Sequence, residues 1–568
     1  MTTRLFFLTL FAIFVLSACG SEEAGNESAS GQTEAPLAAA QGNNPLFDRV
    51  DADTPMLAAN LATAPDEIID HLWQSMEIMS EYSDPSSDEI ADSVDDESPL
   101  LAALLEEISS IQDRESMEAL GLHSNGYWAV HMISVYPVVH FELIDPAAFQ
   151  AMLDRIAADS DTPLPKRQIG GEEIVWIESS GIGVAVHHDE RFVTLAVVPD
   201  NDEMLRRAAN LDRPEQAFQS DQLARFNQDQ GFVRQGSGFI DLQAIFNRLM
   251  DTENSQAATA RSILGLESLA GDPSCKTEMS AMLSIFPRAV AGLSALDMGR
   301  LDMKMVVEAE SGMASRLSEI ADTPVGLSGG EPRTFSAGIA FNLVAARDFG
   351  REVVSNWVES PPKCAAFSDV AENAADWQRA LNQPIPPVVT NIRGLQVNID
   401  DMVMGESGQV EDAAGTLALF VRNPEMLLGM AQMFSPELAA MGLEQNGEPK
   451  PLPAGLIPNM PDLGAFIALG NEAIGLSVGE GQQDNLSAAL TSSGSDPAVF
   501  AYAINFEGYS KLMTSMMSRF GEMEGMPSDE MPPPDFMAPF AELYDTSSFA
   551  VELTDQGIVL KSNLTMKQ

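Results

Sequence analysis

The sequence predicts an α+β protein made of two duplicated units, each an antiparallel β-sheet covered by helices on one face and built from β-β-α modules. Three observations support this prediction. Short segments alternate apolar and polar residues, as half-buried strands do. Tight turns rich in Gly, Asn and Asp separate them, which favours antiparallel pairing. Four such segments return in the same order, at offsets of 258 to 282 residues.

The first repeated segment is a strand followed by a helix that opens on an Asx-Pro pair. Residues 139–143 alternate as a strand and lead into Asp145-Pro146, and residues 417–421 lead in the same way into Asn423-Pro424. An Asx side chain caps free backbone amides, and proline suits the first helical turn. The predicted apolar faces are Phe149, Met152, Leu153 and Ile156 in the first helix and Leu427, Met430 and Phe434 in the second.

Three further segments repeat after this one. They are a strand-turn-strand, a strand leading into a helix, and a hairpin with a turn glycine. Their positions are 184–196 with 466–478, 240–242 with 504–506, and the turns at 297–299 with 555–557.

A helix is predicted ahead of the first repeat. Thr63-Ala64-Pro65-Asp66 is typical of a helix start. The apolar stripe that follows is Ile69, Leu72, Trp73 and Met76. The acidic stretch 83–97 has no spacing that would wrap a calcium ion and is predicted to be a loop. The predicted organisation is a signal peptide (1–18), a flexible acidic tether (19–44), a first unit with a helical lead-in (45–311), a connecting block (312–414) and a second unit (415–568).

The N-terminus carries a targeting signal. Arg4 precedes the apolar run Leu5–Leu16, which is too short to span a bilayer. The following Leu16-Ser17-Ala18-Cys19 resembles the lipobox of bacterial lipoproteins. That resemblance implies cleavage before Cys19, acylation of Cys19 and anchoring in a membrane through two or three acyl chains. Gly20 after the cysteine implies the outer membrane, with the periplasmic and surface sides both open.

Charge excludes two classes of partner. The chain has 84 acidic and 31 basic residues and a net charge of −53. Nucleic-acid binding requires a basic face, and anionic headgroups attract basic patches. We therefore expect no nucleic-acid partner, and membrane contact only through the lipid anchor.

Two cysteines remain after Cys19. In an oxidising compartment Cys275 and Cys364 are predicted to form a disulfide. It would close a loop of roughly ninety residues and stabilise the fold by about 4–5 kcal/mol in the loop-entropy model. There is no C-x-x-C motif, and thus no signal for a redox or zinc site of that kind.

No motif predicts catalysis, a metal or a cofactor. Ser328 lies in a G-x-S-x-G match, but no helix pattern follows, and all histidines precede it. His131, His140, His187 and His188 are predicted to be solvated or partnered, because His187 and His188 would point to opposite faces of one strand.

Two alternatives stay open. Met513, Met516, Met517, Met523, Met526, Met531 and Met537 could bind Cu(I), although the first two lie on an apolar helix stripe. The many carboxylates could serve an envelope hydrolase acting on glycans, although no pair of them is singled out.

The predicted role is therefore non-catalytic. Ala52-Asp53-Thr54-Pro55 and the β-β-α units resemble uncharacterised bacterial surface proteins, which have no known activity to imply. We expect a tethered envelope protein that binds another envelope protein or an apolar ligand, or acts as a scaffold.

Overall fold

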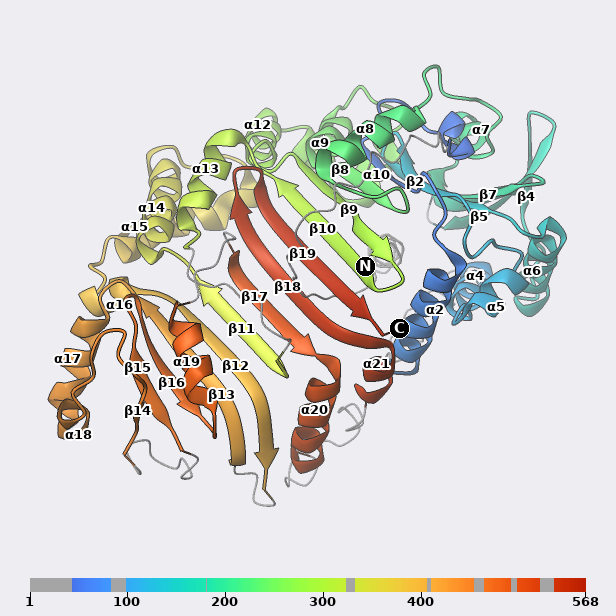
Figure 1. Ribbon diagram of the computed structural model, residues 1–568. Coiled ribbons are helices and arrows are strands. Elements are labelled where there is room, and N and C mark those ends of the chain that lie inside the picture. The colour runs from blue at the N-terminus through green and yellow to red at the C-terminus, as the bar shows by residue number, and fades with distance from the viewer. Residues whose placement is uncertain are drawn as a thin grey trace. The chain divides into compact units, whose positions relative to one another are not determined.

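A computed structural model describes residues 43–82, 99–179, 181–322, 333–405, 410–453, 464–491, 498–520 and 536–567. It contains helices and antiparallel strands, which confirms the predicted α+β class (Figure 1). The chain divides into two compact units, residues 43–298 and 299–567 in the described part. The predicted signal peptide, Cys19, nearly all of the tether, the acidic stretch 83–97 and Ser328 lie outside the described residues. Within them, no helix combines the length and the apolar character needed to cross a bilayer.

Unit 1 contains a nine-stranded antiparallel sheet in the order β4-β5-β6-β7-β3-β2-β1-β8-β9. Its strands are β1 (Met56–Ala59), β2 (Trp128–Ile133), β3 (Tyr136–Glu142), β4 (Lys166–Ile169), β5 (Glu172–Ser179), β6 (Ile182–His188), β7 (Phe192–Pro199), β8 (Ser237–Asp241) and β9 (Arg288–Asp297). Its helices are η1 (Pro45–Arg49), α2 (Asp66–Tyr82), α4 (Pro99–Ser109), α5 (Arg114–Ala119), α6 (Pro146–Asp159), α7 (Asp202–Ala208), α8 (Ser220–Gln230), α9 (Leu242–Met250), α10 (Ala258–Ile263), α11 (Glu267–Ala270) and α12 (Pro273–Leu283).

Helices cover both faces of the unit 1 sheet, which corrects the prediction of helices on one face. On one side α4 and α6 bury a cluster that includes Phe149, Ile156 and Val186. On the other side α7 packs over Trp176 and its neighbours. The reason lies in the sequences of β6 and β7, which are apolar at successive positions. Successive side chains point to opposite faces of the sheet, so both faces are apolar and both are covered by helices.

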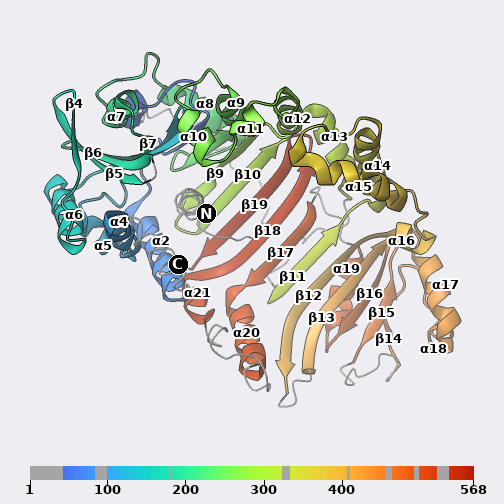
Figure 2. The same cartoon turned by 180° about the vertical axis from the view of Figure 1, so that it is seen from behind.

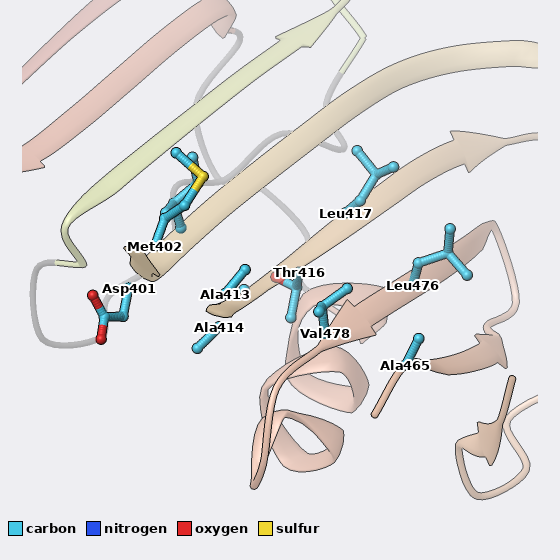
Figure 3. Close-up of a pocket in the computed structure, with 11 residues that line it drawn as sticks. Asp401, Met402, Ala413, Ala414, Thr416, Leu417, Ala465, Leu476 and Val478 are labelled. Atoms are coloured by element: carbon cyan, nitrogen blue, oxygen red, sulfur yellow. The ribbon is translucent and has the colours of Figure 1, made fainter. Parts of the chain in front are cut away.

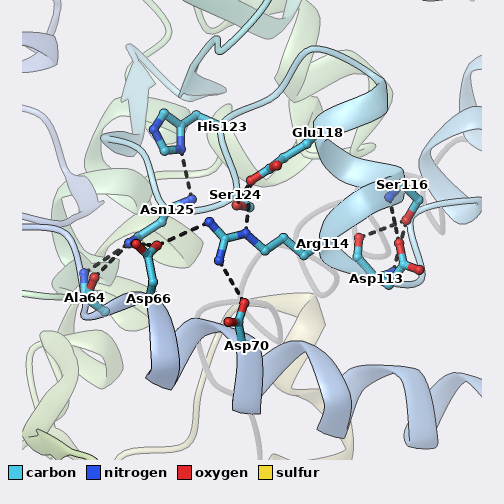
Figure 4. A network of polar contacts seen from close by, with 10 residues as sticks. All are labelled: Ala64, Asp66, Asp70, Asp113, Arg114, Ser116, Glu118, His123, Ser124 and Asn125. Atoms are coloured by element: carbon cyan, nitrogen blue, oxygen red, sulfur yellow. Dashed lines mark hydrogen bonds and ion pairs between the residues drawn. The ribbon is translucent and has the colours of Figure 1, made fainter.

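The lead-in helix α2 begins at Asp66, close to the predicted start, but its buried stripe differs from the predicted one. Ile68 is fully buried, whereas Met76 is exposed. The helix is thus turned by about one residue from the expected orientation. Polar contacts hold it to α5, because Arg114 binds Asp66 and Asp70 on α2 as well as Glu118 on its own helix (Figure 4).

Unit 2 contains a ten-stranded antiparallel sheet in the order β10-β19-β18-β17-β11-β12-β13-β16-β15-β14. Its strands are β10 (Arg300–Glu308), β11 (Phe335–Ala340), β12 (Ile392–Met404), β13 (Val410–Val421), β14 (Lys450–Pro451), β15 (Phe466–Leu469), β16 (Ala473–Val478), β17 (Ala498–Asn505), β18 (Tyr544–Thr554) and β19 (Gly557–Met566). Its helices are α13 (Ser311–Ile320), α14 (Leu343–Glu359), η2 (Ala365–Phe367), α15 (Ser368–Leu381), α16 (Pro387–Asn391), α17 (Pro424–Phe434), α18 (Pro436–Ala440), α19 (Gln482–Thr491), α20 (Phe506–Phe520) and α21 (Ala538–Leu543).

Residues 312–414, which we predicted to be a connecting block, contribute to this sheet. They supply β11 and β12, which lie side by side between β17 and β13. The predicted repeats did not include these strands, and the sequence pattern could not indicate that their partners are β13 and β17, farther along the chain.

The two units pair corresponding strands in the same order. In unit 1 the order β5-β6-β7-β3-β2-β1-β8-β9 corresponds, strand by strand along the chain, to β14-β15-β16-β13-β12-β11-β17-β18 in unit 2. The register agrees as well, because Val139 faces Leu195 in unit 1 and Leu417 faces Leu476 in unit 2. A helix follows β3 and its counterpart β13, α6 in unit 1 and α17 in unit 2.

Candidate ligand-binding site

One face of the unit 2 sheet is apolar and partly open to solvent. Cross-strand register places on it a set of side chains from five neighbouring strands, none of them charged. We call this set the open apolar face: Phe335, Ala337, Ile339, Leu395, Val397, Ile399, Leu417, Leu419, Ile474, Leu476, Phe500 and Tyr502. Figure 1 shows α19 in front of the opposite face, and Figure 2 shows the sheet from behind.

The opposite face has the reverse character. There α19 packs on β13 and β16, and several of the strand residues beneath the helices are polar. Asn398, Thr416 and Ser477 are buried on that side, and Asn398 donates a hydrogen bond to Thr416 Oγ1 over 2.9 Å. On the open side Ile339, Leu395, Leu417 and Phe500 are each more than a third exposed. Since exposed apolar patches and buried polar groups are both unusual, this distribution makes the open side a candidate binding surface.

A pocket of about 300 Å³ lies at one corner of this face. Ile399 and Met402 from β12, Leu417 from β13, and Leu476 and Val478 from β16 line it. Figure 3 labels Met402, Leu417, Leu476 and Val478 on these strands. The remaining lining residues are Asp401, Ala413, Ala414, Gly415, Thr416 and Ala465, of which only Asp401 is charged. The volume is at the lower end of the range for small-molecule sites, and the lining suits a hydrocarbon group rather than a polar one.

Unit 1 holds a second, polar pocket of about 280 Å³. Its arginines are already engaged, because Arg207 contacts Asp51 at 2.6 Å and Arg248 contacts Asp53 at 2.9 Å. The Ser134 hydroxyl lies there, buried and without a hydrogen-bond partner. Since the charged groups are largely paired with one another, this pocket offers less free chemistry than the open apolar face.

His131 and His140 form a buried pair in unit 1. Their Nε2 atoms lie 3.0 Å apart, so one ring donates a proton and the other accepts it. His140 Nδ1 is 2.8 Å from Thr194 Oγ1. Burial lowers the pKa of His131 to about 4, and burial together with the neighbouring His131 lowers the pKa of His140. The pair is partnered, as predicted.

The other residues singled out by sequence fall in three places. His187 and His188 end β6, and His188 contacts Gln150 on α6. Met513, Met516 and Met517 lie on α20, Met523 to Met531 lie outside the described residues, and Met537 precedes α21. No group of three His, Cys, Asp or Glu side chains suited to a metal ion occurs among the described residues.

Cys275 and Cys364 are both buried, and each is disulfide-bonded. Cys275 lies in the first turn of α12, where Asp272 caps the helix. Cys364 directly precedes η2. That the two pair with each other stays a prediction from sequence, which peptide mapping under non-reducing conditions would test.

The open apolar face was not predicted as a site. Its strands were recognised in part by their alternation, but alternation alone does not tell which apolar face receives helices. The available signal was the polar set Asn398, Thr416 and Ser477, at positions that alternate with the apolar ones.

No family model and no curated protein matches the chain. It is similar to two solved structures, crystal forms III and I of TP0453, at 10% and 11% sequence identity. Each match covers 50% of this chain, and 89% and 88% of the respective structure, with TM-scores of 0.24 and 0.23. Scores this low carry no argument about fold or role.

Proposed function

We propose that this is a lipid-anchored envelope protein whose role is binding rather than catalysis, and that the open apolar face of unit 2 is its binding surface. The observation that carries the proposal is the set of uncharged side chains across five paired strands, open to solvent in a chain of net charge −53. Such a face is costly to leave in water, since each square ångström of exposed apolar surface contributes about 25 cal/mol. An apolar partner that covers it recovers that free energy.

We further propose that the two units arose by duplication, and that only the second kept an uncovered face. The shared strand order and the matching register support this proposal. The first unit, with its helical lead-in, then serves as a stable body and the second as the binding part.

Nile red, a neutral dye that fluoresces in apolar surroundings, tests the binding surface on the full mature chain. We expect saturable binding that Leu417→Asp weakens by at least about tenfold, because a carboxylate would enter the apolar pocket. Met282→Asp on α12 is the matched control, since Met282 is an exposed methionine in unit 1. Absence of dye binding to the wild-type chain, or equal binding to both variants, would refute the proposal.

The anchor has its own test. Mass spectrometry of the N-terminal peptide from native membranes should show an acylated Cys19, and Cys19→Ala should release the chain into the soluble fraction. A leader still attached, or an unmodified Cys19, would contradict the envelope location without touching the binding surface.

A further inference from the structure

Corresponding helices of the two units differ sharply in exposure. In α6 the apolar stripe Phe149, Met152 and Ile156 is buried, with Phe149 only 2% exposed. In α17 the corresponding stripe is half-buried at Leu427 and exposed towards the end of the helix, with Met430 38% and Phe434 86% exposed, and Met433 beside it is 74% exposed. Both helices start from an Asx-Pro cap after the corresponding strand, so the difference does not lie in the helices themselves.

What differs is the helix that covers the stripe. In unit 1, α4 packs against α6, and Leu100, Leu101 and Leu104 complete the cluster over the sheet. The chain supplies α4 from the segment between β1 and β2. In the described part of unit 2, α17 is followed by the short helix α18, and Met430 and Phe434 of the α17 stripe stay exposed.

The strand residues next to these helices differ between the two units in the same way. Val186, Val193 and Leu195 belong to the cluster under α4 and α6. The register sets Ile474 and Leu476 of unit 2 at the positions of Val193 and Leu195. Leu476 lines the apolar pocket. The pocket and the α17 stripe are therefore at the positions that helix α4 and its contacts fill in unit 1.

The charged residues around the pocket and α17 indicate the charge of a helix that could bind there. Asp401 lines the pocket, and Asp412, Glu425 and Glu437 are exposed on β13, α17 and α18. A covering helix with acidic flanks would be repelled, and one with lysine or arginine beside its apolar stripe would be attracted.

We propose that unit 2 binds an amphipathic helix of another protein, with a leucine stripe and basic flanks, seated on the open apolar face beside α17 as α4 is seated beside α6. This inference rests on the proposed function and names the class of partner. The binding mode is helix-in-groove recognition, in which apolar residues at i, i+3 or i+4 anchor the helix.

A peptide of residues 99–119, which contains α4, is the probe. Its binding to the full mature chain is followed by fluorescence anisotropy, in the natural form and with Glu106→Lys and Glu107→Lys. We expect the lysine form to bind several-fold more tightly at low salt, because Coulomb attraction is screened as salt rises. Replacing Leu100, Leu101 and Leu104 by serine in the peptide should weaken binding by at least about tenfold.

Two receptor variants locate the site. Phe434→Asp changes a side chain that is almost wholly in water, so the fold tolerates it, and Leu417→Asp changes the pocket. Both variants should lower the affinity for the lysine form of the peptide by at least about tenfold, whereas Met282→Asp should leave that affinity unchanged. No peptide binding, or equal binding to all receptor variants, would overturn the inference.

The outcomes separate this inference from the proposed function. If Nile red binds and the peptide does not, the open apolar face is a binding surface but not one for a helix. If Phe434→Asp abolishes flotation of the unacylated Cys19→Ala chain with phosphatidylcholine vesicles and leaves peptide affinity unchanged, the stripe contacts lipid and the helix proposal is wrong.

Discussion

Units 1 and 2 share a strand order but differ in how their sheets are covered. In unit 1, apolar clusters lie on both faces, under α4 and α6 on one side and α7 on the other. In unit 2, α19 covers one face and the other carries the open apolar face. The comparison shows that one strand order can carry a closed core or an exposed apolar face, depending on whether a helix of the chain packs on that face.

The largest expected effect is the difference in stability between matching substitutions on the apolar stripes of α6 and α17. Phe149→Ala on α6 should destabilise unit 1 by about 3–5 kcal/mol, because it empties a buried aromatic site. Phe434→Ala on α17 should cost less than about 0.5 kcal/mol, because that ring is already in water. Urea unfolding of the full chain measures both. Similar costs for the two variants would mean that α17 is covered after all.

The second prediction concerns acid, since every histidine of the chain lies in unit 1. The pKa of His131 is about 4 when folded and about 6.5 when unfolded, so the unfolded chain binds more protons between these values. The stability that the neutral His131 contributes is complete above pH 6.5 and is lost as the pH falls toward 4. Its size is about 3 kcal/mol.

The test of this prediction replaces the pair. His131→Asn with His140→Gln should flatten the fall of unit 1 stability between pH 6.5 and 4, measured by urea unfolding at several pH values. His71→Asn, on α2, is the control and should leave the fall in place. An unchanged pH profile in the double variant would assign the acid sensitivity to carboxylates.

A smaller effect is expected at the two corresponding helix caps. Asp145 accepts hydrogen bonds from two backbone amides at the start of α6, and Asn423 accepts one at the start of α17. Asp145→Ala should lower the stability of unit 1 by about 1 kcal/mol. Asn423→Ala should instead speed hydrogen exchange within α17 with little change in the unfolding midpoint, because a helix with an exposed stripe opens locally. Equal losses of global stability would contradict the looser packing of α17.

The caps also show how far the sequence predicts the fold. The Asx-Pro pairs and the alternation at 139–143 and 417–421 located two strands and two helices, because cap chemistry and side-chain period are local. Partners are not local: β11 lies between β12 and β17, the latter more than 150 residues away along the chain. For the same reason, the sequence did not predict the candidate site, which depends on strand pairing. Leu417 and Leu476 are apolar strand residues like any others until the register shows that nothing in the described part of unit 2 covers them as α4 covers unit 1.

The smallest expected effect concerns the ion pairs that hold helix α2 to α5 in unit 1. Arg114 joins Asp66 and Asp70 of α2 to Glu118 of α5, and the hydrogen bonds to Asp70 and Glu118 raise the pKa of its guanidinium. The partners are partly exposed, so Arg114→Gln should cost less than about 1 kcal/mol, and the cost should shrink in high salt. Arg379→Gln removes a largely exposed pair with Asp376 and should cost nothing measurable. If Arg114→Gln instead releases α2 to rapid hydrogen exchange and exposes the cluster beneath α4, charge rather than apolar packing keeps the first unit closed, and the two units differ by a few ion pairs rather than by a helix.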